Sequence, residues 1–256
     1  MRLDHLLVQR GLLPSRERAR RAVMAGAVEV DGRRVDKPGA QVADSAAVAV
    51  VERGEPYVSR GGRKLAAALD ALGVEPDGKV CLDVGASTGG FTDCLLQRGA
   101  ARVAAVDVAY GQIDLRLRED ARVTVLERLN ARRLVPADLP FRPDLATVDV
   151  SFISLTKVLP ALAGCLAPGG EVLAMVKPQF ELGRERVRKG VVRDAADRRE
   201  AILTVALAAR EQGLAVRGFA SSGLPGPKGN RETFVRCGGA GEPLAEIEAA
   251  IGEVDP

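Results

Sequence analysis

The 256-residue chain has no tryptophan, a single histidine and only 3% aromatic residues. Proteins that hold a nucleic-acid strand by stacking one base after another need many aromatic side chains, so this composition argues against such a surface. The one histidine, His5, lies in an expected amphipathic helix at the N-terminus, where a position on the helix surface is the simplest interpretation. A histidine-based catalytic triad is therefore excluded.

The four cysteines are scattered and form no C-x-x-C pair, so neither a zinc site nor a redox motif is indicated. Long hydrophobic runs are lacking as well, because the uncharged stretch near residues 158–170 is short and interrupted by Pro and Gly. Charged residues follow Met1 at once, which differs from a secretory signal peptide. We expect a cytoplasmic protein without stable membrane association, and nothing in the sequence indicates an oligomer.

Glycine is frequent, and its most informative cluster lies in the segment KVCLDVGASTGGFTDCLLQRG. Apolar residues up to Val84 indicate a strand, a glycine-rich turn follows over residues 85–90, and Phe91 and Leu95 recur at helical spacing. This order is typical of the first unit of a doubly wound nucleotide-binding sheet. The turn is not G-x-G-x-x-G and no G-K-[ST] occurs, so neither a dinucleotide fold nor a P-loop is supported.

Two carboxylates in this region suggest the ligand. Asp83 stands near the end of the first strand, where its charge suits a ligand that carries an ammonium group. Asp107 ends the next expected strand, where a carboxylate can accept hydrogen bonds from both hydroxyls of an adenosine ribose. An ammonium group, a ribose and close backbone contact together describe S-adenosylmethionine better than NAD.

Four charged residues far apart in the chain indicate the chemistry: Lys64, Asp149, Lys177 and Glu232. They are the last residues of the segments SRGGRK, LATVD, EVLAMVK and GLPGPKGNRE, and three of them are expected at edges of strands. Two lysines and two carboxylates in a buried cluster can hold one lysine neutral at pH 7 as a general base. The alternative is a set of surface ion pairs, which the nearby nucleotide-binding unit makes the weaker interpretation.

Strands and helices alternate through residues 62–240, which predicts an α/β, Rossmann-like sheet with helices on both faces. Ligands of such sheets bind beyond the carboxyl ends of the strands, where the candidate residues are expected to converge. The expected strands are 79–84, 102–107, 122–126, 144–149, 170–176, 214–221 and 232–237. The expected helices are 62–73, 89–98, 112–119, 155–167 and 194–212.

The first fifty-odd residues predict a separate small α+β module. Two short helices are expected, the second capped by Ser15 over residues 16–26 with a buried stripe at Ala19, Ala22 and Val23. Short strands at 28–30, 33–36 and 48–51 follow, with a hairpin turn at residues 31–32. From Met1 to Lys64 there are thirteen Lys and Arg against eight Asp and Glu, a net charge of +5. This asymmetry favours a polyanionic partner.

The chain resembles the TlyA (haemolysin-like) family of ribosomal RNA 2′-O-ribose methyltransferases, which is related to the FtsJ type. The matching segments include VSRGGRKL, LDVGASTGGFTDCLLQRGA, VDVAYGQ, VLERLNAR, VDVSFISL, VKPQFE and LPGPKGN, and run from about Tyr57 to Phe234. The resemblance places the family's Lys-Asp-Lys-Glu tetrad on the four charged residues above. One departure is Thr88, where the FtsJ-type loop usually has Pro.

The resemblance implies S-adenosylmethionine as cofactor, S-adenosylhomocysteine as product, no required metal, and methylation of a ribose in ribosomal RNA with cytidine as the expected nucleoside. It also implies that the last strand of the sheet runs antiparallel, and that ribosomal RNA or a ribosomal subunit is the partner. The cofactor-binding residues expected from the motifs are Asp83, Gly85, Ser87, Thr88, Gly89, Gly90, Asp107 and Asn130.

The N-terminal module resembles the S-four-type RNA-binding fold. We expect this module at 1–54, a linker at 55–61, the FtsJ-like methyltransferase domain at 62–240 and a helical C-terminal tail at 241–256. Phosphate contacts position an RNA but do not read its sequence, so base specificity is not predicted. The expected RNA-binding residues are Arg16, Arg18, Arg20, Arg21, Arg33, Arg60 and Arg63.

The mechanism expected from these assignments centres on Lys177, which would remove the proton of the ribose 2′-hydroxyl as a neutral amine. Asp149 and Glu232 would hold the lysines and orient the hydroxyl, and Lys64 is the alternative base because two coupled lysines cannot be separated by sequence. Three other functions are weighed: an RNA base methyltransferase, an RNA-binding module without catalysis, and a membrane-active haemolysin. The N-P-P-[YF] motif of many base methyltransferases is missing.

Overall fold

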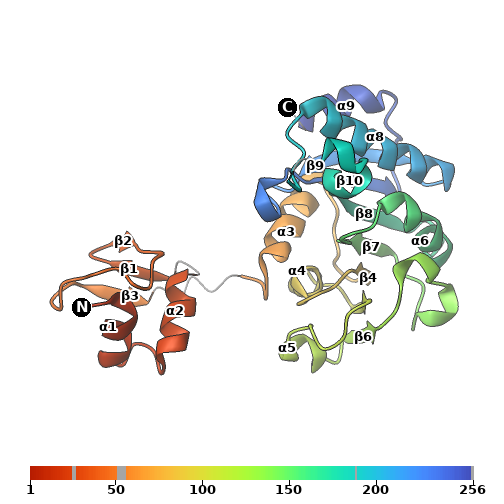
Figure 1. The fold of residues 1–256 in the computed structure, drawn as a ribbon. Coiled ribbons are helices and arrows are strands. Elements are labelled where there is room, and N and C mark those ends of the chain that lie inside the picture. Colours follow the sequence, from red (N-terminus) through yellow and green to blue (C-terminus); the bar gives the residue numbers. More distant parts are fainter. Residues whose placement is uncertain (25–26, 51–55, 188, 255–256) are drawn as a thin grey trace. The chain divides into compact units, whose positions relative to one another are not determined.

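The computed structural model describes residues 1–24, 27–50, 56–187 and 189–254, without the side chains of Arg21, Met24, Arg184 and Pro227. The chain divides into an N-terminal unit, Met1–Pro56, and a C-terminal unit, Tyr57–Pro256 (Figure 1). Each unit has a hydrophobic core of its own. The predicted linker begins at Glu55, which lies outside the described residues, and its last two positions belong to a helix that begins at Arg60.

The N-terminal unit packs two helices, α1 (Leu3–Gln9) and α2 (Arg16–Met24), on a small antiparallel sheet. In its described part the sheet has the order β2-β1-β3, with β1 (Val28–Val30), β2 (Arg33–Arg34) and β3 (Val48–Val50). The predicted helix end at residues 25–26 and strand end at Val51 lie outside the described residues.

Local signals in this unit act as predicted. Ser15 begins α2, because its Oγ accepts a hydrogen bond from the Arg18 amide at 3.2 Å. Asp31 and Gly32 both have positive φ, 50° and 74°, and form the predicted two-residue hairpin turn between β1 and β2. The predicted stripe on α2 is buried at Ala19 and Val23, which pack against α1.

The C-terminal unit is built on one mixed sheet, whose described strands have the order β6-β5-β4-β7-β8-β10-β9. The first five strands of this order pair in parallel, whereas β10 is antiparallel to both β8 and β9, as predicted for the last strand. The strands are β4 (Val80–Val84), β5 (Arg102–Asp107), β6 (Val123–Glu127), β7 (Leu145–Val148), β8 (Glu171–Val176), β9 (Val216–Ser221) and β10 (Thr233–Gly238).

Helices cover both faces of this sheet, which confirms the predicted fold class (Figure 1). Successive side chains of a strand point to opposite faces, so in β4 Leu82 enters one core and Cys81 the other. One face is covered by α3 (Arg60–Leu72), α4 (Gly90–Gln97) and α5 (Leu115–Arg118). The other face is covered by α6 (Leu159–Cys165), α8 (Ala195–Glu211) and α9 (Ile247–Val254).

Two predicted helices were wrong in extent. The helix expected at 112–119 is only α5, because Asp114 accepts a hydrogen bond from the Arg116 amide at 2.9 Å and starts the helix there. The helix expected at 155–167 is instead a 3₁₀ turn, η3 (Leu155–Lys157), followed by α6. Pro160 has no amide hydrogen and suits the first turn of a new helix rather than the interior of a long one.

The carboxyl ends of the parallel strands position the predicted residues. Asp107 ends β5, Asp149 follows β7 directly, and Lys177 follows β8 and precedes a short helix that was not predicted, α7 (Pro178–Glu181). Together with β4, which pairs in parallel with β5 and β7, these strands present their ends, and the loops after them, at one edge of the sheet. Among the described residues, no helix combines the length and the apolar character that crossing a membrane requires.

Candidate active site

The turn after β4 requires glycine at two positions. Gly85 has φ +85°, and a Cβ placed on it would lie 2.4 Å from the backbone oxygen of Asp149. Gly89 has φ +97°, and its Cβ would lie 2.2 Å from Leu117 Cδ1. A side chain at either position would be strained in φ and would collide with its neighbour. The glycine turn thus packs directly against the backbone that carries Asp149.

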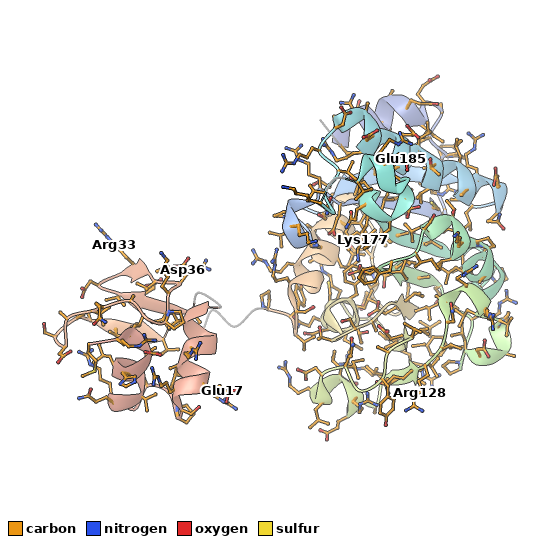
Figure 2. All side chains as sticks on the ribbon, in the orientation of Figure 1. Glu17, Arg33, Asp36, Arg128, Lys177 and Glu185 are labelled. Atoms are coloured by element: carbon orange, nitrogen blue, oxygen red, sulfur yellow. The ribbon has the colours of Figure 1, made fainter. Side chains whose placement is uncertain are left out.

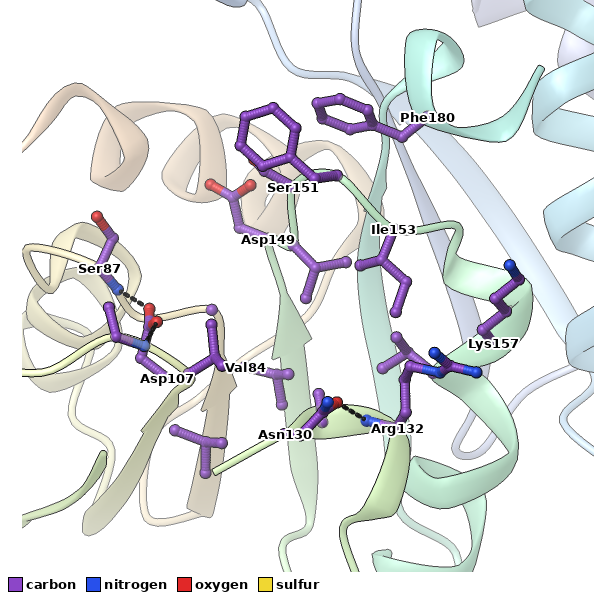
Figure 3. A pocket seen from close by; sticks show the side chains of 18 of the residues that line it. Val84, Ser87, Asp107, Asn130, Arg132, Asp149, Ser151, Ile153, Lys157 and Phe180 are labelled. Atoms are coloured by element: carbon purple, nitrogen blue, oxygen red, sulfur yellow. Dashed lines mark hydrogen bonds between the residues drawn. The ribbon is translucent and has the colours of Figure 1, made fainter. Parts of the chain in front are cut away.

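Asp107 holds this turn in place. Its Oδ2 accepts a hydrogen bond from the Ser87 amide at 2.7 Å, and its Oδ1 accepts one from the Ala109 amide at 2.8 Å (Figure 3). Each carboxylate oxygen keeps a second lone pair, so Asp107 can also accept hydrogen bonds from a ligand. Asp107 and Asn130 line a cavity of about 960 Å³ at the carboxyl edge of the sheet.

Asn130 lies near Asp107 in this cavity, because the Leu129 amide donates a hydrogen bond to the Asp107 backbone oxygen at 3.0 Å, and its side chain has a structural role there. Its side-chain oxygen accepts a hydrogen bond from the Arg132 amide at 3.0 Å and caps the 3₁₀ turn η1 (Ala131–Arg133) (Figure 3). Its amide nitrogen has no such bond within the described part of the chain, so this end of the side chain can face a ligand.

The four residues of the predicted tetrad come together as two ion pairs. Lys64 on α3 pairs with Glu232, which lies just before β10, and Lys177 pairs with Asp149. Lys64, Lys177 and Glu232 are 7%, 8% and 1% exposed, so these charges are buried rather than on the surface. Surface ion pairs are therefore not the explanation of this quartet.

All four tetrad residues line a second cavity of about 420 Å³. Its wall also includes Thr88 and Gly90 from the glycine turn and Arg60 from the start of α3. The two cavities share Gly85, Ser87 and Asp149, so they adjoin at the glycine turn and at one member of the tetrad. A ligand in the larger cavity and a group held by the tetrad would meet at this point.

Asp83 is placed differently from the other predicted cofactor residues. Its side chain is fully buried and lines neither cavity. Its Oδ2 accepts a hydrogen bond from Thr92 Oγ1 at 2.6 Å, while its Oδ1 has no partner in the part of the chain that the structure describes. Burial raises the pKa of Asp83 to about 7, and the hydrogen bond from Thr92 opposes this shift. A buried carboxylate with one open oxygen is the kind of group that a nearby cationic ligand would stabilise.

The predicted RNA-binding arginines have different surroundings. In the N-terminal unit, Arg16 forms an ion pair with the buried Asp4 at 3.2 Å, whereas Arg18, Arg20 and Arg33 are exposed. Figure 2 shows Arg33 pointing outward from the hairpin. The side chain of Arg21 is outside the described structure. Arg16 therefore has a structural partner that the sequence did not indicate.

In the C-terminal unit, Arg60 and Arg63 are both exposed on the first turn of α3. Arg60 donates a hydrogen bond from Nη2 to the Pro225 oxygen at 3.1 Å, and this contact joins α3 to the turn before Glu232. Both arginines are thus close in sequence to Lys64, and Arg60 lines the tetrad cavity with it.

Sequence reasoning missed the residues that follow Asp149 and Lys177. Lys177 Nζ donates a hydrogen bond to Ser151 Oγ at 3.0 Å. Phe152 is 91% exposed, has φ 64°, and its ring lies 5.2 Å from that of Phe180 at the rim of the larger cavity. The motifs VDVSFISL and KPQFE contain these residues, but the sequence assigns a role only to Asp149 and Lys177 within them.

A partly buried carboxylate joins these two motifs. Glu181 at the end of α7 accepts hydrogen bonds from Ser154 Oγ at 2.5 Å and from the Leu155 amide at 2.9 Å. Burial raises the pKa of Glu181, and these two hydrogen bonds oppose the shift. The loop after Asp149 and the helix after Lys177 are consequently held at a constant separation.

Comparison with known proteins gives two matches to family models: residues 57–239 match the FtsJ-like methyltransferase model and residues 1–48 match the S4 domain model. A 16S/23S rRNA (cytidine-2′-O)-methyltransferase, TlyA of Mycobacterium tuberculosis, is 49% identical over 91% of this chain and 88% of its own. Hemolysin A of Brachyspira hyodysenteriae is 40% identical over 76% of this chain and 81% of its own.

A solved structure from Streptococcus thermophilus, provisionally assigned as a hemolysin, is 40% identical and has a TM-score of 0.76. The match covers 99% of this chain and 94% of the other. Sequence identity of this size over nearly the whole chain, together with the two domain matches in the same order, is decisive for the family. The chain belongs to the TlyA family of ribosomal RNA 2′-O-methyltransferases, with an S4 domain followed by an FtsJ-like, S-adenosylmethionine-dependent methyltransferase domain.

Proposed function

We propose that this protein methylates the ribose 2′-hydroxyl of a cytidine in ribosomal RNA, with S-adenosylmethionine as methyl donor and Lys177 as general base. The observation that carries the proposal is the position of the buried Lys177–Asp149 pair, because Asp149 belongs to the walls of both adjoining cavities. The larger cavity suits the cofactor and the tetrad cavity suits the ribose. The relative from Mycobacterium tuberculosis, whose name describes a 16S/23S rRNA (cytidine-2′-O)-methyltransferase, supports cytidine in ribosomal RNA as the substrate.

The residues of the larger cavity fit S-adenosylmethionine. Asp107 offers carboxylate lone pairs at a strand end, where ribose hydroxyls are bound in sheets of this type. Gly85 allows close backbone approach, and the open oxygen of Asp83 beneath the turn favours a cationic ligand nearby. When bound, S-adenosylmethionine supplies a methyl group that its sulfonium already activates, so the proposed reaction does not depend on a metal.

The protein's own part in the reaction is to take a proton and to hold the ribose. A ribose hydroxyl is a weak acid and must lose its proton as its oxygen attacks, and the Nζ of a neutral Lys177 can accept that proton. Asp149 orients Lys177, and the Lys64–Glu232 pair forms the facing wall of the same cavity. Among the described residues, the buried Oε1 of Glu232 has no hydrogen-bond partner, so it can accept a hydrogen bond from the substrate.

Each of the two units has side chains that suit an RNA substrate. The exposed Phe152, in ring contact with Phe180 beside the larger cavity, offers a flat apolar surface on which an unstacked base can lie. Arg18, Arg20 and Arg33 of the S4 domain are exposed and free to meet phosphates, and Arg60 lines the tetrad cavity itself. We assign the S4 domain to docking and the FtsJ-like domain to chemistry.

The test compares Lys177→Arg and Lys64→Arg with the wild-type enzyme in single-turnover methylation of ribosomal subunits that lack the modification. A guanidinium stays protonated and cannot act as a base, so Lys177→Arg is expected to lose about 10³-fold in rate with S-adenosylmethionine affinity nearly unchanged. Lys79→Arg is the matched control, because Lys79 pairs with Glu171 at the other edge of the sheet. A Lys177→Arg enzyme of near-normal rate would exclude Lys177 as the base and leave Lys64.

A further inference from the structure

The two lysines of the tetrad differ in the number of oxygens around them. Lys177 Nζ contacts the carboxylate of Asp149 and also donates a hydrogen bond to Ser151 Oγ at 3.0 Å. Among the described residues, Lys64 has one such partner, the carboxylate of Glu232. Ser151 is exposed and lines the larger cavity (Figure 3), two residues after Asp149, which lines both cavities.

The second oxygen matters because of the shape of an amine. A neutral lysine has two N–H groups and one lone pair, which point in tetrahedral directions. The hydrogen bond to Ser151 Oγ fixes one N–H direction of Lys177, and the contact with Asp149 confines the amine on a second side, so the lone pair is limited to the directions that remain. A lysine with one acceptor can rotate about that single contact, so its lone pair has no defined direction.

We propose that Ser151 is a positioning residue that directs the lone pair of Lys177 toward the RNA 2′-hydroxyl. The proposal rests on the proposed function, in which Lys177 is the base. It gives a physical reason why Lys177 rather than Lys64 takes the proton. Ser151 does this without touching the reacting atoms, through one hydrogen bond to the Lys177 amine.

The surroundings of Ser151 hold this hydrogen bond in place. Lys177 is followed directly by α7, and Glu181 at the end of α7 accepts hydrogen bonds from Ser154 and from the Leu155 amide. Ser151 lies three residues before Ser154 on the same loop. The lysine and the serine are therefore attached to two segments that the partly buried carboxylate of Glu181 holds together.

The experiment measures single-turnover methylation and S-adenosylmethionine affinity for Ser151→Ala and Ser151→Thr. We expect Ser151→Ala to lower the rate about 10- to 100-fold, the loss typical of a small misalignment, while the KM for RNA and the cofactor affinity stay within about twofold. Ser151→Thr keeps the hydroxyl and is expected to restore most of the rate. Ser221→Ala is the matched control, an exposed serine whose Oγ also accepts one hydrogen bond, from the Gly223 amide at 3.3 Å.

A double mutant separates this proposal from the proposed function. If Ser151 acts through Lys177, adding Ser151→Ala to Lys177→Ala will cost no further rate, because the interaction is already lost. A wild-type rate for Ser151→Ala, or equally slow Ala and Thr variants, overturns the positioning role even when Lys177→Arg is inactive. An active Lys177→Arg enzyme overturns the assignment of the base, and the role of Ser151 falls with it.

Discussion

Replacing Gly85 with alanine should displace the glycine turn after β4 relative to Asp149. The new Cβ would lie 2.4 Å from the Asp149 backbone oxygen, about 1 Å closer than an ordinary van der Waals contact. The Asp149 amide is itself bonded to the Val84 oxygen at 2.9 Å, so the backbone of Asp149 cannot move away without breaking a contact between β4 and β7. Either the glycine turn or Asp149 must shift.

The expected cost has two parts. Alanine at φ +85° costs about 1 kcal/mol, and the collision adds about 1–3 kcal/mol of overpacking, so the free energy of unfolding should fall by roughly 2–4 kcal/mol. A displacement of about 1 Å at a catalytic group can lower a rate about 100-fold. We expect Gly85→Ala to lose at least this much single-turnover activity and to bind S-adenosylmethionine more weakly.

Gly78→Ala is the control, because Gly78 has φ +69° but no atom within 4 Å of the added Cβ. Gly78→Ala should lose only the free energy of unfolding that a positive φ costs an alanine, about 1 kcal/mol, which urea unfolding measures. Its methylation rate and its affinity for S-adenosylmethionine should be normal. Calorimetric titration with S-adenosylmethionine and single-turnover rates for both variants make the comparison. If Gly85→Ala behaves like Gly78→Ala in all three measurements, the contact between the glycine turn and Asp149 has no role in the site.

Two predictions concern pH. The hydrogen bond from Arg2 lowers the pKa of Asp4 to about 2, so this carboxylate should stabilise the S4 domain above pH 4 and lose that effect as pH falls toward 2. Asp4→Asn should cost about 1 kcal/mol at pH 7, since the arginine partners are largely exposed; hydrogen exchange of α1 and α2 in the full chain measures it. Burial raises the pKa of Asp83 to about 7, so its effect has the opposite sign: stability falls as pH rises from about 4 to 7. Thermal unfolding should show Asp83→Asn more stable than wild type at pH 8, with the difference shrinking toward pH 5.

Local features of this protein could be predicted because neighbours in the sequence decide them. Ser15 caps α2 through an amide three residues away, and Asp31 and Gly32 turn the hairpin by their own backbone preferences. The alternation of strands and helices and the glycine turn follow from the same short-range rules. The family's motifs also pointed to the four tetrad residues, which the fold brings to the wall of one cavity.

Only the tertiary structure decided how these residues pair. Lys64 and Glu232 are 168 positions apart and meet because the fold brings α3 beside the turn that leads into β10. The complete burial of Asp83 likewise depends on helix α4, which supplies Thr92, and not on the strand that carries Asp83. The hydrogen bond between Lys177 and Ser151 depends on the parallel pairing of β7 and β8, which aligns the two loops that follow them. The sequence shows where lysines and carboxylates occur along the chain. Only the distances between atoms in the folded protein show that, among the described residues, Lys177 has two oxygen partners and Lys64 one.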